Sequence, residues 1–173
     1  LEECGLQSVV FHDVTPNPRD YEVMAGTAIY HDEGCDVIMA LGGGSVIDCA
    51  KGIGIVAANG GHILDYEGVD RIPQPGPPLI CIPTTAGTAA DISQFAIINN
   101  TVQRYKIAIV SKSVVPDVSL VDPETITTLD PYLIACTGLD TLTHAIEAYV
   151  STANSPVLDV HALAAIELVR DHL

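Results

Sequence analysis

A buried strand that runs through a glycine turn into a helix is the feature that most constrains how this chain folds. Residues 37–41 are continuously apolar, which is typical of a strand covered on both faces of a parallel sheet. Gly42-Gly43-Gly44-Ser45 follows at once, and residues 45–58 have helical character that ends at Asn59-Gly60-Gly61. A strand, a glycine turn and a helix in this order predict a β-α-β arrangement, and therefore an α/β domain.

The same alternation continues along most of the chain. We expect a helix at 19–31 and strands at 8–11, 36–41, 79–82, 93–98, 106–110 and 118–121. The strands at 93–98 and 106–110 are expected to form a hairpin that turns at Asn99-Asn100. Residues 131–173 have helical periodicity throughout, and Asp130-Pro131 places a capping residue before a proline at the first helical position. The sequence therefore predicts an α/β domain over residues 1–130 and the start of an all-helical domain over residues 131–173.

Composition excludes several classes of partner. Twenty-two acidic residues stand against seven Lys and Arg, a formal charge of −15, which disfavours binding to nucleic acid or to an anionic membrane. No segment reaches the roughly 18 consecutive apolar residues of a membrane span, and the first residues are acidic where a signal peptide is basic. Five widely spaced cysteines indicate reduced core residues. We expect a cytoplasmic protein, and, because no methionine opens the chain and the helical pattern runs on to Leu173, a piece of a longer one.

The glycine turn indicates a site for phosphate. At the junction of a strand and a helix, backbone N–H groups point outward at the positive end of the helix, and no Cβ blocks a close approach. The alternative is that Ser45 caps the helix together with Asp48, while the glycines only turn the chain. Residues 84–88 form a second small-residue loop after another strand, and loops at the carboxyl ends of parallel strands line one crevice. Taken singly this is an ordinary loop, but the pair favours a nucleotide site.

An aspartate and a histidine lie four residues apart in the helical part. Asp140 and His144 share one helical face, so both can bind the same divalent ion. A carboxylate oxygen and an imidazole nitrogen suit iron(II), zinc or manganese. The alternative is structural: Thr137 caps the helix, Asp140 complements the helix dipole and His144 is a core histidine.

Together these residues resemble the iron-containing alcohol dehydrogenase family. The segments 42–51, 83–88 and 138–147 are similar to its three signature segments, in the same order and at similar separations. Asp65-Tyr66-Glu67-Gly68 is similar to the branch that acts on 1,3-propanediol, methanol and other short primary alcohols. Ala89-Ala90-Asp91 departs from the Gly-Ser-Glu usual in the family. The family's leading strand should precede Leu1, and two later histidine ligands should follow Leu173.

The resemblance implies a fold and a set of site residues. The fold is a dehydroquinate synthase-like, two-domain one, with a Rossmann-like domain for NAD or NADP, an all-helical metal domain and an active site between them. Asp140 and His144 correspond to the first two ligands of a divalent metal, with iron(II) expected and zinc(II) the alternative. The residues that correspond to the cofactor site are Gly43, Gly44, Ser45 and Asp48 around the pyrophosphate, Thr84, Thr85 and Thr88 on the adenosine side, and Lys106 near the cofactor.

The activity implied is that of an oxidoreductase. It transfers hydride between a short primary alcohol or its aldehyde and the nicotinamide, and the family resemblance is consistent with a homo-oligomer, a dimer or larger. Two alternatives stay open: a zinc glycerol dehydrogenase or dehydroquinate synthase-like relative, and a nucleotide-binding or interaction module without catalysis. Because two ligands seldom hold a catalytic ion, we expect these 173 residues by themselves to be inactive.

Overall fold

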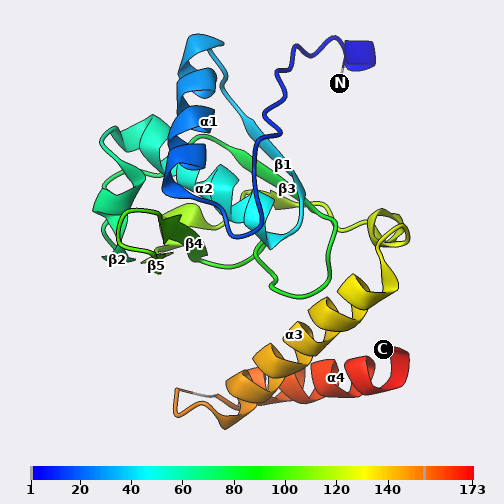
Figure 1. Ribbon diagram of the computed structural model, residues 1–173. Coiled ribbons are helices and arrows are strands. Elements are labelled where there is room, and N and C mark those ends of the chain that lie inside the picture. The colour runs from blue at the N-terminus through cyan, green and yellow to red at the C-terminus, as the bar shows by residue number, and fades with distance from the viewer. Residues whose placement is uncertain (1, 154) are drawn as a thin grey trace.

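The computed structural model describes residues 2–153 and 155–173, and it consists of an α/β part followed by a pair of helices (Figure 1). A parallel sheet has the order β1-β3-β6, with strands β1 (Ile38–Gly42), β3 (Leu79–Pro83) and β6 (Val118–Ser119). A second sheet has the order β2-β5-β4, in which β4 runs antiparallel to β5. Its strands are β2 (Gly68–Val69), β4 (Phe95–Asn100) and β5 (Tyr105–Val110).

Helices cover and extend these sheets. The α-helices are α1 (Asp20–Asp32), α2 (Gly44–Asn59), α3 (Pro131–Val150) and α4 (Pro156–His172). Short 3₁₀ helices are η1 (Glu2–Cys4), η2 (Ile63–Tyr66), η3 (Lys112–Val114) and η4 (Pro123–Ile126). Helices α3 and α4 pack side by side, away from the two sheets (Figure 1). Among the described residues, no helix is both long and apolar enough to cross a membrane.

Helix α2 lies between the two sheets and contributes to both hydrophobic cores. Ile47 and Ala50 pack in one cluster with residues of β1 and β3, whereas Ile53 and Val56 pack in the other with residues of β4 and β5. Each such isoleucine removed from water contributes roughly 2 kcal/mol. The helix that follows the glycine turn is therefore fixed from both sides, and so is the turn itself.

Most predicted elements of the α/β part are confirmed, but the strand expected at 8–11 is wrong. These residues are extended without a hydrogen-bonded ladder, and the Val10 side chain is 77% exposed. An apolar, β-branched run satisfies only half of what a strand needs, because its N–H and C=O groups also need a neighbouring strand. Within the described part of the chain, no strand forms a hydrogen-bonded ladder with residues 8–11.

The predicted hairpin is confirmed, but its turn lies later than expected. Asn99 and Asn100 belong to β4, and residues 101–104 form the turn. The Asn100 side-chain oxygen accepts hydrogen bonds from the backbone N–H of Val102 at 3.1 Å and of Gln103 at 2.9 Å. Arg104 then takes a positive φ of 59°. Asn100 therefore starts the turn with its side chain while its backbone remains in the strand.

The helical character expected over residues 131–173 is found in two helices, since α3 ends at Val150 and α4 begins at Pro156. Ser155 is the N-cap of α4, and its hydroxyl accepts from Leu158 N at 3.4 Å. Proline at the first helical position disfavours helical backbone in the residue before it, which separates the two helices. Asn154 lies outside the described residues.

The prediction that the five cysteines are reduced core residues is only partly confirmed. All five are free thiols, but only Cys49 and Cys81 are buried.

Two glycines inside α2 provide a paired test of its packing. A Cβ at Gly54 would lie 3.6 Å from Pro77 Cδ, an ordinary contact, so Gly54→Ala should stabilise the protein by about 0.5–1 kcal/mol. A Cβ at Gly52 would lie 3.0 Å from both γ carbons of Val23, so Gly52→Ala should give no such gain. Urea unfolding of the two variants measures the difference. Equal stabilisation would contradict the close packing of α2 on α1.

Candidate cofactor and metal site

The glycine turn leaves the amino end of α2 open. Gly43 is the N-cap residue, and within the described structure no side chain caps this helix. Ser45 Oγ instead accepts a hydrogen bond from Asn17 N at 3.0 Å, and Asp48 Oδ2 accepts from Ile97 N at 3.2 Å. The alternative in which Ser45 and Asp48 form a capping box is therefore wrong. The first-turn amides of α2 can bind an anion.

The second loop lies directly against this turn. A Cβ at Gly43 would be 3.2 Å from Thr85 Oγ1, and one at Gly44 would be 2.7 Å from Thr88 Oγ1. Both loops follow strands that are neighbours in the parallel sheet, since β1 pairs with β3 from Ile38 to Gly42. Backbone amides and threonine hydroxyls therefore face the same space. A side chain at Gly44 would displace Thr88, and one at Gly43 would crowd Thr85.

A cavity of about 510 Å³ opens at this point. Every predicted cofactor residue except Thr84 lines it, namely Gly43, Gly44, Ser45, Asp48, Thr85, Thr88 and Lys106. Thr84 instead donates its backbone N–H to Gly42 O at 3.0 Å, which continues the pairing of β1 with β3. Segment 14–18, Ile97 and Asn99 of β4, and Leu133 and Thr137 of α3 complete the walls. The cavity is therefore bounded by the segments that follow β1 and β3, by the β4–β5 hairpin and by α3.

Asn17 is a lining residue that the sequence reasoning missed. Its side-chain oxygen accepts a hydrogen bond from Lys106 Nζ at 2.6 Å, and its carbonyl accepts from Asn99 Nδ2 at 2.7 Å. Its backbone N–H reaches Ser45, so it joins α2 to both strands of the hairpin. A positive φ of 60° makes this possible, and asparagine tolerates that conformation better than most residues. The signal in the sequence is an asparagine held between Pro16 and Pro18.

The Asp48 carboxyl group, which lines the cavity, has a raised pKa. Burial raises its pKa to about 6, although the nearby Lys51 and the hydrogen bond from Ile97 N act in the opposite direction. Desolvation disfavours the charged form, so burial is the larger effect. Close to neutral pH this group therefore exchanges between its neutral and charged states.

Asp140 and His144 lie together on α3. His144 Nε2 is 3.7 Å from Asp140 Oδ2, and both side chains are partly exposed. Asp130 is the N-cap of this helix and accepts from Tyr132 N at 2.9 Å, so Thr137 does not cap it. Asp140 lies well beyond the first turn of α3, where the helix dipole has little effect, and the His144 side chain is 56% exposed. The structural alternative is therefore wrong in its cap, its dipole role and its core histidine.

The Asp140 and His144 pair lies beside the loop that borders the cavity. A Cβ at Gly87 would be 3.2 Å from Asp140 Oδ2, and Thr141 Oγ1 donates to Ala86 O at 3.4 Å. Two donors about 2.1 Å from one ion lie at most about 4.2 Å apart, so a separation of 3.7 Å fits two ligands of the same ion. The described residues contain no group of three or more metal-ligating side chains. The pair thus fits a partial coordination set.

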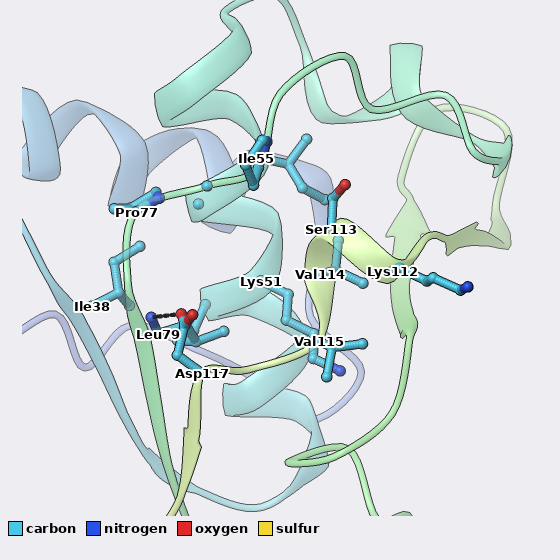
Figure 2. A pocket seen from close by; sticks show the side chains of 14 residues that line it. Ile38, Lys51, Ile55, Pro77, Leu79, Lys112, Ser113, Val114, Val115 and Asp117 are labelled. Carbon is cyan, nitrogen blue, oxygen red and sulfur yellow. Dashed lines mark hydrogen bonds between the residues drawn. The ribbon is translucent and has the colours of Figure 1, made fainter.

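A second hollow lies on the other side of α2. It has a volume of about 170 Å³ and is bordered by residues 75–77 and by η3 (Figure 2). Asp117 accepts a hydrogen bond there from Leu79 N at 2.9 Å, and the side chain of Lys51 runs along its wall. The residues that line this hollow include Lys51 and its neighbours on α2, but none from the glycine turn or from the threonine loop.

The chain combines two parts. One is an α/β part whose parallel strands end in a glycine turn and a hydroxyl-bearing loop, and the other is a pair of helices that carries an Asp–His pair. This combination defines a class of proteins. Residues 1–123 match the family model described as iron-containing alcohol dehydrogenase, and residues 134–173 match that of the C-terminal part of the Fe-containing alcohol dehydrogenase family. The chain belongs to the iron-containing alcohol dehydrogenase family.

Individual relatives agree with this assignment. The chain is 49% identical over its whole length to alcohol dehydrogenase 4 of Schizosaccharomyces pombe, and covers 41% of that protein. It is 39% identical to the NAD-dependent methanol dehydrogenase of Bacillus methanolicus, again over its whole length, and covers 45% of that protein. A solved structure of a 1,3-propanediol oxidoreductase matches 98% of the chain with a TM-score of 0.95 and 41% identity, and 44% of that structure is covered. The chain thus spans less than half the length of these relatives.

The pKa of Asp48 predicts a pH dependence of stability. Because the folded state binds this proton more tightly than the unfolded chain, the contribution of Asp48 is complete below about pH 4 and is lost as the pH rises through about 6. Asn at this position cannot ionise. Between pH 4 and pH 7 the unmodified protein should therefore lose about 2 kcal/mol relative to Asp48→Asn. Urea unfolding at both pH values tests this, and equal pH dependence in the two proteins would contradict it.

Proposed function

We propose that the whole protein is a metal-dependent, NAD(P)-linked alcohol dehydrogenase that transfers hydride between a short primary alcohol and the nicotinamide cofactor. One observation carries this proposal. The loop at residues 84–88 touches the glycine turn on one side and Asp140 on the other. A cavity that suits a dinucleotide therefore adjoins a side-chain pair that suits a divalent metal.

The relatives support this proposal. Their names specify NAD for the methanol dehydrogenase and a short diol for the propanediol oxidoreductase. We further propose a dehydroquinate synthase-like arrangement of two domains that meet near Asp130, a homo-oligomer, and a cytoplasmic protein. With 22 acidic residues and only seven Lys and Arg, neither nucleic acid nor a membrane is a proposed partner.

Each group of residues has a distinct role in the proposed site. The amides of Gly43, Gly44 and Ser45 bind the cofactor pyrophosphate at the positive end of α2, where Asp48 lies one turn further on. The hydroxyls of Thr85 and Thr88 line the same cavity, with Thr84 at the end of β3, and this loop holds the adenosine side. Lys106, fixed by its hydrogen bond to Asn17, places a positive charge in the wall.

Asp140 and His144 hold the metal in the proposal. When bound, iron(II), or zinc(II) as the alternative, supplies Lewis acidity that lowers the pKa of the alcohol oxygen, and the nicotinamide accepts hydride. The chain's own contribution is to align these groups across the loop at 84–88 and to exclude water. Because only two metal-ligating side chains of the described residues come together here, we propose that the 173 residues by themselves are inactive.

Replacing Gly43 with valine tests the cofactor site. The added side chain would press on Thr85, since even its Cβ would lie 3.2 Å from the Thr85 hydroxyl, and it would cover the amides of the turn. NADH binding, measured by fluorescence titration in the whole protein, should weaken by about tenfold or more. Gly54→Ala, in the same helix but away from this cavity, is the control and should bind NADH normally. Unchanged affinity in a folded Gly43→Val protein would refute the assignment.

Replacing Asp140 or His144 with alanine tests the metal site. Each variant loses a ligand and should lose bound metal and alcohol oxidation, while NADH binding should persist because the glycine turn belongs to the other part of the protein. Elemental analysis and a thermal melt of the purified variants provide the measurement. If Asp140 is only a surface carboxylate of α3, its loss should leave the metal in place. Full metal occupancy in folded His144→Ala would defeat the ligand assignment.

A further inference from the structure

Strand β4 has one edge that is not paired with another strand of the sheet. Its carbonyls and amides at even-numbered positions face β5, as shown by the bonds from Ser111 N to Gln94 O and from Arg104 N to Asn100 O. Groups at 93, 95, 97 and 99 face the opposite way, because alternate residues of a strand direct their backbone groups to the same edge. An unpaired edge inside a protein must find other partners.

Helix α2 supplies most of these partners through two charged side chains. Lys51 Nζ donates to Ser93 O and Phe95 O at 2.8 Å each, and to Ser93 Oγ at 3.2 Å. Asp48, one turn earlier, accepts from Ile97 N at 3.2 Å. The next amide along this edge, that of Asn99, donates to Pro18 O at 2.8 Å. A helix thus takes the place of a neighbouring strand.

Lys51 is unusual because the hydrogen bonds of its buried ammonium group all go to neutral acceptors. The residue is 2% exposed, and within the described chain no carboxylate forms an ion pair with it. All three of its ammonium protons have acceptors, two of which are backbone carbonyls. Burial lowers the pKa of this lysine, whereas Asp48 raises it. A methionine would fill similar space more cheaply, so the ammonium is retained for its hydrogen bonds.

The edge held in this way belongs to a wall of the cofactor cavity. Side chains at 96, 98 and 100 are buried, whereas Ile97 and Asn99 line the cavity opposite the glycine turn. We propose that Lys51 is a positioning residue for the dinucleotide, which keeps Ile97 and Asn99 in place by holding the free edge of β4. This inference rests on the proposed function, because it presupposes that the cavity binds NAD(H).

Lys51→Met in the whole protein tests the proposal. The Kd for NADH and the KM for NAD should both rise by about tenfold, as the loss of a buried, charge-assisted set of hydrogen bonds predicts. The KM for the alcohol and the metal content should not change, since Asp140 and His144 lie on α3. Amide hydrogen exchange across residues 93–97 should become faster, which reports the edge directly and without ligand.

Two further lysine variants make the result specific. Lys112→Met removes an exposed lysine of η3 beside the second hollow (Figure 2) and should leave both NADH binding and exchange unchanged. Lys51→Arg retains the charge and part of the hydrogen bonding, so its Kd should lie between those of the unmodified protein and Lys51→Met. If Lys51→Met does not fold, a higher Kd for NADH and faster exchange in Lys51→Arg than in the unmodified protein decide.

Unchanged NADH affinity and unchanged exchange in a folded Lys51→Met or Lys51→Arg protein would overturn the proposal. An equal rise in the KM for alcohol and in the KM for NAD would also overturn it, because it would indicate a general structural defect. If the unmodified protein does not bind NADH, the proposed function fails, whereas the exchange data still decide whether Lys51 holds the edge of β4.

Discussion

The packing of α2 between two sheets is the constraint on which the rest of this structure depends. A helix that contacts β1 and β3 on one side and β4 on the other cannot rotate or shift without opening one of the two cores. Glycine occurs in this helix where a close neighbour such as Val23 leaves little room for a side chain. The few polar side chains of the helix must find hydrogen-bond partners inside the protein. Asp48 and Lys51 do so along the edge of β4, so the helix determines where the hairpin lies as well as where the glycine turn points.

The site follows from this placement. Because the turn precedes α2 and the second loop follows the neighbouring strand β3, the amides of one loop and the hydroxyls of the other meet at the carboxyl edge of the parallel sheet. The hairpin adds the opposite wall, with Asn17 and Lys106 linked by a hydrogen bond. The same threonine loop then reaches Asp140 on α3. A single short loop thus connects the cavity proposed for the dinucleotide with the pair proposed for the metal, which is the arrangement that hydride transfer between an alcohol and the nicotinamide would require.

Local reasoning succeeded where a short-range rule decides the conformation and failed where a distant partner does. The helix before Gly34 and the helix start at Asp130-Pro131 depend on capping groups adjacent in sequence, and both are found. Residues 8–11 have the composition of a strand, but they pair with no other strand of the described chain. Ser45 and Thr137 were reasonable caps by spacing, yet Ser45 binds Asn17, 28 residues away, and Thr137 lies inside α3.

The sequence by itself determined the α/β character, the glycine turn at the start of α2, the threonine loop after β3 and the placement of Asp140 and His144 on one helical face. These features depend on residue type and on periods of two or 3.6 residues, which can be read along the chain. Only the tertiary structure decided that Asn17 joins the turn to the hairpin, that Lys51 and Asp48 serve the edge of β4, and that burial raises the pKa of Asp48 to about 6. These properties arise from groups tens of residues apart that are brought together in a desolvated interior, and no local pattern encodes that proximity.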